Sequence, residues 1–184
     1  MGVAAAWMLL WTALGVDGPA PACAPELFRI ARSTNANVVV YEARLGAPGS
    51  LDPREPVHAS WIMLAGDGHR EELTFLERGL AYGFEASEGS ALELKLRAQP
   101  ERPIAVRFLG GCPAAFTTIA GRRAILRRIF VQVGGGPFPE VQSVELLGSD
   151  ASDGTEVRES VPGGVPAGAE GPRMAGAWPG RRLR

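Results

Sequence analysis

Residues 91–97 read Ala-Leu-Glu-Leu-Lys-Leu-Arg, the most regular alternation of apolar and charged residues in the chain. Side chains of a β-strand point alternately to its two faces, so this pattern places one row in a core and the other in water. The inward row is Leu92, Leu94 and Leu96, and the outward row is Glu93, Lys95 and Arg97. A strand with one buried and one solvated face is typical of an antiparallel sheet.

Runs of similar character lie on both sides of this strand, separated by residues that favour turns. Apolar, β-branched and aromatic residues dominate at 27–32, 38–45, 57–64, 103–109, 115–120, 124–133, 141–147 and 155–161. Glu71 to Gly83 has the spacing of a helix, and Gly83 suits the left-handed conformation that ends one. Many short strands with one helix predict a mainly β fold, an antiparallel β-sandwich or open barrel with one short α-helix packed on it.

The two ends of the chain differ in composition from its middle. An apolar run at 3–16 leads into small residues and prolines at 18–25, so residues 1–24 have the layout of a secretory signal peptide or linker. Residues 25–161 form the predicted single β-rich domain. Residues 162–184 are rich in Gly, Pro and Arg and are predicted to be disordered. We therefore expect a secreted or periplasmic protein.

Cys23 leaves a second interpretation of this N-terminal segment open. A lipid anchor on Cys23 would tie the protein to a membrane, although Ala20 stands where that motif needs an apolar residue such as Leu. An uncleaved, buried segment is the third interpretation. We favour cleavage and secretion, and we expect membrane association only if Cys23 is lipidated.

The composition argues against several classes of partner and cofactor. A net charge of -1 over 184 residues is far from the cationic excess that nucleic-acid binding needs. Two cysteines and two histidines at these spacings form no zinc motif, and we expect no cofactor. Cys23 and Cys112 could form a disulfide after export. We favour the alternative, in which Cys23 lies in a linker and Cys112 occupies a turn.

His58 is the centre of one catalytic hypothesis, a hydrolase-like enzyme. Ser60 and Asp67 are close to it in sequence, so a Ser-His-Asp site is possible in principle. Residues two apart on a strand point the same way, but no nucleophile elbow or other catalytic motif accompanies them. We favour a structural role for His58, and a non-enzymatic binding or envelope-associated domain as the function.

A set of amide and aromatic side chains forms the candidate ligand site. Amides and aromatic rings with polar tips are the groups that bind small polar ligands such as sugars or peptides. The candidate ligand-binding residues are Asn35, Asn37, Tyr41, His58, Trp61 and Tyr82. The competing interpretation is that the two asparagines fix a turn and that the aromatic rings belong to the core.

Three stretches together resemble one family of bacterial proteins. They are Arg-Ser-Thr-Asn-Ala-Asn-Val-Val-Val-Tyr at 32–41, Pro-Val-His-Ala-Ser-Trp-Ile at 56–62, and Glu-Leu-Thr-Phe-Leu-Glu-Arg-Gly-Leu-Ala-Tyr-Gly at 72–83. Residues 141–148 with Asp153 and Gly154 are similar to its closing segment. The family is the domain of unknown function number 4833, and the resemblance covers about residues 27–161. It implies an exported single domain without an established activity, supplies no catalytic residues, and includes the six candidate positions in its pattern.

Overall fold

The structure is a computed structural model that describes residues 23–47, 49–88, 91–134 and 140–163. Apart from residues 23, 24, 162 and 163, the predicted signal segment and tail lie outside this part of the chain. The strands are β1 (Glu26–Arg32), β2 (Asn35–Ala43), β3 (Val57–Ile62), β4 (Arg70–Glu72), β5 (Phe84–Glu88), β6 (Leu92–Leu96), β7 (Gln99–Leu109), β8 (Cys112–Ile119), β9 (Arg122–Val133), β10 (Val141–Asp150) and β11 (Glu156–Pro162). The helix is α1 (Phe75–Leu80).

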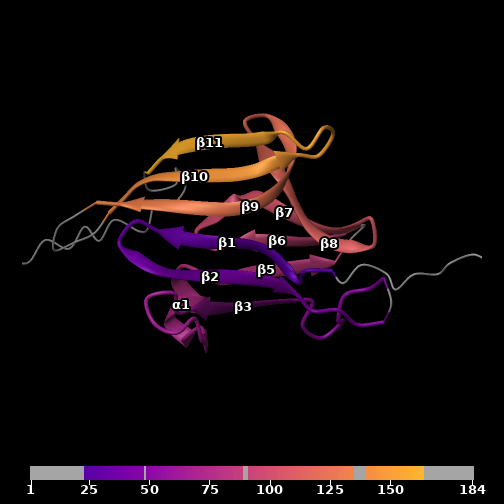
Figure 1. Cartoon of the computed structure of the whole chain (residues 1–184), viewed down its shortest axis with the longest axis horizontal. Helices are drawn as coiled ribbons and strands as arrows, with labels where there is room; N and C mark the ends of the chain where they lie inside the picture. The colour runs from indigo at the N-terminus through magenta and orange to yellow at the C-terminus, as the bar shows by residue number, and fades with distance from the viewer. Residues whose placement is uncertain (1–22, 48, 89–90, 135–139, 164–184) are drawn as a thin grey trace, which may run out of the picture.

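The strands belong to one sheet that curls into an open half-barrel (Figure 1). Their order is β4-β3-β2-β1-β9-β8-β7-β6-β5, with β10 on β9 and β11 on β10. Neighbouring strands are antiparallel, except that β1 and β9 run parallel. The mainly β fold with one short helix is therefore confirmed, in the form of a curled open sheet.

Strand β9 is the point at which the sheet branches. Its first residues pair with β8, and residues 128–131 pair with β1. Strand β10 pairs with β9 from residue 124 to residue 133, so it occupies the opposite edge of β9 along that length. One edge of β9 therefore pairs first with β8 and then with β1, and its other edge pairs with β10.

Helix α1 joins the two ends of the strand order. Strands β4 and β5 are the outermost strands, yet they are consecutive in sequence, with α1 between them. The predicted helix from Glu71 to Gly83 was too long, because residues 70–72 pair with β3 as β4. Thr74 begins the helix: its hydroxyl accepts from the Glu77 backbone N–H, and the Glu77 carboxylate accepts from the Thr74 N–H. This reciprocal cap stops the helix from extending toward β4.

The core lies on the concave face of the sheet. Leu94 is completely buried while Lys95 is exposed, as the alternation of residues 91–97 predicts. The ring of Tyr41 stacks on Phe28 with 4.4 Å between ring centroids. Its hydroxyl donates to the Tyr82 carbonyl oxygen at 2.6 Å, which ties β2 to the segment after α1. The core thus spans from β1 and β2 to the far end of the strand order.

Cys23 and Cys112 form a disulfide, contrary to the interpretation favoured from the sequence. Their Cα atoms lie 5.3 Å apart, within the range that a disulfide bridges. Cys112 begins β8, and Cys23 precedes β1. Strands β1 and β8 both pair with β9, which brings these two distant segments together.

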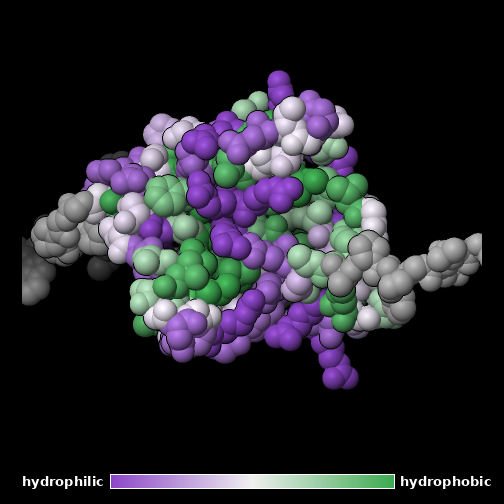
Figure 2. Space-filling view, in the orientation of Figure 1, coloured by the Kyte–Doolittle hydropathy of each residue, from purple (hydrophilic) through white to green (hydrophobic). Residues whose placement is uncertain are grey.

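No described helix is long and apolar enough to cross a membrane. On the face that Figure 2 presents, polar residues cover much of β10 and β11, and apolar residues gather over β1 and β2 beside α1. Val38 to Tyr41 of β2 are buried as an unbroken run, which requires cover on both faces of the strand.

Candidate functional site

The fold brings Asn35, Trp61 and Tyr82 to one surface depression, where α1 meets the ends of β1 and β2. The indole of Trp61 meets the Tyr82 ring edge-on, with 5.1 Å between centroids. The Trp61 Nε1 donates to the Glu77 carboxylate at 3.0 Å, so the helix holds the indole in place. Three of the six predicted residues therefore share a site that sequence separation alone would not reveal.

Arg32, the last residue of β1, lies over this aromatic pair. The central carbon of its guanidinium group is 4.8 Å from the centre of the Tyr82 ring, a cation–π distance. Its Nε is buried and has no hydrogen-bond partner in the described structure. A buried donor without a partner costs free energy, so this nitrogen favours any acceptor that can reach it.

Glu77 gives the depression a second charge. Burial opposes ionisation of its carboxyl group, but hydrogen bonds from Thr74 and Trp61 and the positive charge of Arg32 outweigh burial and hold its pKa below the usual value. Burial raises the pKa of the neighbouring Tyr82 hydroxyl, against the opposing effect of Arg32. The site thus combines a carboxylate, a guanidinium, a neutral phenol and an indole.

An apolar groove of about 500 Å³ adjoins this depression inside the half-barrel. The two hollows share Arg32, Ala81 and Tyr82. The groove is lined by apolar side chains of β1, β6, β9, β10 and β11, namely Ile30, Leu96, Ile129, Val131, Val144 and Val161. Arg102 lies on its rim, where its guanidinium binds the Glu159 carboxylate.

The remaining predicted residues of the first strand pair have structural contacts. Tyr41 is fully buried, and burial raises the pKa of its hydroxyl strongly. The Asn35 side-chain oxygen accepts from the Asn37 backbone N–H at 2.9 Å. The Asn37 side-chain oxygen accepts from the Ala65 N–H at 3.0 Å. Both asparagines therefore hold turns, as the competing interpretation requires, although Asn35 also lines the depression.

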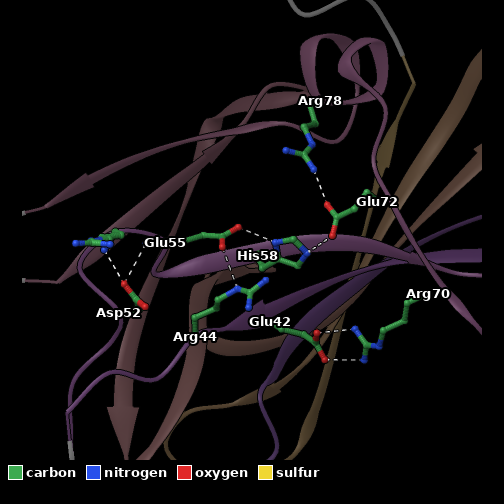
Figure 3. A network of polar contacts seen from close by, with 9 residues as sticks. Glu42, Arg44, Asp52, Glu55, His58, Arg70, Glu72 and Arg78 are labelled. Carbon is green, nitrogen blue, oxygen red and sulfur yellow. Dashed lines mark hydrogen bonds and ion pairs between the residues drawn. The ribbon is translucent and has the colours of Figure 1, made fainter.

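His58 lies in a different depression, at the far end of β3 (Figure 3). Its Nδ1 is 2.7 Å from Glu55, and its Nε2 is 3.0 Å from Glu72. Arg44 pairs with Glu55 and Arg78 with Glu72, so the imidazole lies between two carboxylates that are each paired with a guanidinium group. The hydrogen bond with His58 is the main reason why the pKa of Glu55 is lowered.

The other members of the catalytic hypothesis do not join His58. The Ser60 hydroxyl accepts a hydrogen bond from Arg70, which also binds Glu42 through both of its terminal nitrogens. Asp67 is bound to His69 instead. Within the described residues, no hydrogen bond links His58 to a hydroxyl group. No described group of three or more His, Cys, Asp or Glu side chains is placed to hold a metal ion.

A family model described as Domain of unknown function (DUF4833) matches residues 28–160. The chain belongs to this family. Neither a search of curated proteins nor a search of solved structures found a match. The family resemblance seen in the sequence is thus confirmed. Because the family has no known function, the function of this chain must be inferred from its structure.

Sequence reasoning missed Arg32, Glu77 and the apolar groove. One signal for Arg32 was present: Phe28 and Ile30 point into the core, and Arg32 follows in the same alternation, so a charge falls on an inward position at the strand end. Glu77 carried a weaker signal as the acidic partner of Thr74 in a capping pattern. The groove left no signal in the sequence, because its lining comes from five strands spread along the chain.

Proposed function

We propose that this chain is a non-enzymatic, exported binding domain, with its ligand site at the depression formed by Asn35, Trp61 and Tyr82. The observation that carries the proposal is the edge-on pair of Trp61 and Tyr82, with Arg32 above and Glu77 beside it, around one open hollow. Aromatic faces bordered by a few oriented polar groups are the usual construction of sites for small polar ligands. A sugar-like or peptide-like ligand from the cell envelope fits this chemistry.

The disulfide supports export. Disulfides persist in oxidising compartments and are rare in the reducing cytosol. Cys23 lies near the end of the segment predicted as a signal peptide or linker and is bonded to Cys112, so cleavage before Cys23 would leave the bond intact. A sulfur atom that is held in a disulfide cannot also carry a lipid, so the bond supports secretion without a lipid anchor at Cys23.

The N-terminus of the protein recovered from its producing cell tests export. We expect mass spectrometry to show a mature chain that begins between about Val16 and Cys23, with Cys23 oxidised. An intact Met1 together with two reduced cysteines would contradict export.

The contacts of His58 argue against catalysis at the second depression and for a structural role. A general base needs a nitrogen that is free to accept the proton of a nucleophile. Both nitrogens of His58 face carboxylates, and the nearby Ser60 hydroxyl serves Arg70. We therefore assign the cluster around His58 to holding β3, β4 and the preceding loop together.

Titration calorimetry with soluble peptidoglycan fragments, which carry N-acetylated sugars and short peptides, tests the binding site. We expect saturable binding that Trp61→Ala weakens about tenfold, the effect of a central aromatic contact. Phe130→Ala is the control, because it removes a ring from β9 that lines neither hollow. Equal affinities of the parent and Trp61→Ala for the fragments would refute this placement of the site.

Asn37→Ala separates a turn residue from a binding residue. The asparagine accepts from the Ala65 N–H, and it does not line the depression. We expect a lower melting temperature with unchanged fragment affinity. A loss of affinity at an unchanged melting temperature would instead place Asn37 in the site.

A further inference from the structure

We propose that the ligand is an anionic amphiphile with one alkyl chain, whose chain lies in the apolar groove and whose anionic head binds Arg32. The inference rests on the proposed function, because it extends the same site inward from the aromatic depression. The two hollows meet at Arg32, Ala81 and Tyr82. One molecule can therefore occupy both, with its polar end beside Trp61 and its apolar end between the strands.

The groove has the size and lining of a site for an alkyl chain. Its volume of about 500 Å³ falls within the range of small-molecule sites. Ile30, Ile129, Val131, Val144 and Val161 lie on four neighbouring strands, and Val144 pairs with both Val131 and Val161, so the five side chains form one continuous wall. All five belong to or pack against the concave core, so the groove continues the core rather than the outer surface. An alkyl chain would complete the burial of this lining.

Arg32 supplies the argument for a negative charge. It lines both hollows, it lies on the Tyr82 ring, and its buried Nε has no hydrogen-bond partner in the described structure. Arg102, on the same groove, already binds Glu159 through both terminal nitrogens. A guanidinium group binds carboxylate and phosphate oxygens through paired hydrogen bonds. Because the Nε is buried, an anionic head group would bind the terminal nitrogens of this guanidinium where Arg32 lines the two hollows.

Glu77 does not remove this preference. Its carboxylate accepts from the Thr74 N–H, the Thr74 hydroxyl and the Trp61 Nε1. These bonds keep its oxygen atoms turned toward the helix cap and the indole. Its charge still repels an anion at close range, which favours a head group that carries one negative charge over one that carries two.

Calorimetry on the disulfide-bonded, full exported chain tests the inference with defined probes. The probes are octanoate, decanoate and dodecanoate below their micellar concentrations, with dodecyltrimethylammonium as the cation of equal chain length. Each fully buried methylene contributes about 0.8 kcal/mol, or about fourfold in affinity. Because the groove is partly open, we expect a gain of about two- to fourfold per methylene, and weaker binding of the cation.

Two variants and a control locate the interaction. Arg32→Gln should weaken dodecanoate binding about tenfold and leave binding of the cationic probe unchanged or stronger, since a charge-assisted hydrogen bond is lost. Val161→Trp fills the groove from the edge strand β11 and should weaken binding of every alkyl probe. Arg107→Gln removes the same charge from an exposed position outside both hollows and should change nothing. Melting curves of the variants exclude misfolding as the cause.

The outcomes separate this inference from the proposed function. If peptidoglycan fragments bind in a Trp61-dependent manner and no alkyl probe binds, the amphiphile is refuted and the polar site stands. If neither class binds, both proposals are wrong. Affinity that is independent of chain length, or equal for the anion and the cation, refutes the inference. Light scattering that shows a dimer abolished by Val161→Trp would make the groove an interface between two copies, and would also refute it.

Discussion

Glu159 on β11 should control the acid stability of this protein. Its carboxylate accepts from both terminal nitrogens of Arg102, at 2.6 and 2.8 Å, and from the Ala120 N–H at 2.7 Å. Arg102 also donates to the Thr118 carbonyl oxygen at 2.7 Å. Among the strands that the structure describes, β11 pairs only with β10, so the pair of Glu159 and Arg102 fastens the β10–β11 branch to β7 and β8. Glu159→Gln keeps the size of the side chain and removes its charge.

The pKa of Glu159 sets the size of the effect. The hydrogen bond with Arg102 is the main reason why this pKa falls from 4.5 to about 2, against the opposing effect of burial. A shift of that size corresponds to about 3 kcal/mol of stability. Solvent screening applies because the pair lies near the surface, so we expect about 1–2 kcal/mol. The folded carboxyl has the lower pKa, so this stability is complete above about pH 4.5 and is lost as the pH falls toward 2.

Urea unfolding monitored between pH 2 and 7 measures this contribution. Glu159→Gln should be less stable than the parent by about 1–2 kcal/mol at pH 7, and the difference should shrink steadily below pH 4.5. Glu156→Gln is the matched control, because Glu156 is exposed on the same strand and its contact with Arg158 is 3.5 Å long. A difference between parent and Glu159→Gln that does not change with pH, or an equal effect of Glu156→Gln, would refute the reasoning.

Three further variants test the core, the disulfide and the buried hydroxyl. Leu94→Ala should cost about 2–5 kcal/mol, because it opens a cavity under the sheet, while Lys95→Ala stays within about 0.5 kcal/mol; equal losses in urea unfolding would show that this strand faces the other way. Cys112→Ala opens a loop with a sequence separation of 89 and should cost up to about 4 kcal/mol relative to the oxidised parent, whereas reducing agent should leave the variant unchanged. Tyr41→Phe leaves the Tyr82 carbonyl without its donor and should cost about 1–2 kcal/mol; a neutral result in thermal melts would mean that water replaces the hydroxyl.

The alternation of apolar and polar residues predicted the strands well where one face is buried and the other is exposed to solvent. Leu92 to Leu96 alternates in the structure as in the sequence, because strand geometry forces the two faces apart. The pattern failed between residues 70 and 88. Glu71 and Glu72 fall in the predicted helix but belong to β4 and pair with β3, and Phe84 begins β5 directly after the predicted helix, where no strand was expected. Tertiary pairing overrode local propensity there, since both segments are edge strands that depend on a neighbour.

The candidate site was predictable in part. Asn35, Trp61 and Tyr82 were identified by their chemistry, and the fold brings them together. Their proximity was not predictable, because it depends on α1 spanning the two outermost strands of the sheet. The apolar groove could not be predicted from the sequence either, because its lining comes from strands that only the fold brings together.

The mainly β fold, the family, the presence of one helix and the inward face of the regular strands could all be predicted from the amino-acid sequence, because each depends on local alternation or on matching residues. Three features required the folded structure: β1 lies parallel to β9, Cys23 is bonded to Cys112, and Arg32 at the end of β1 lies over the Tyr82 ring. These contacts join residues about 50 to 100 positions apart. Their existence depends on how the sheet curls, and that depends on the packing of the whole core rather than on any single stretch.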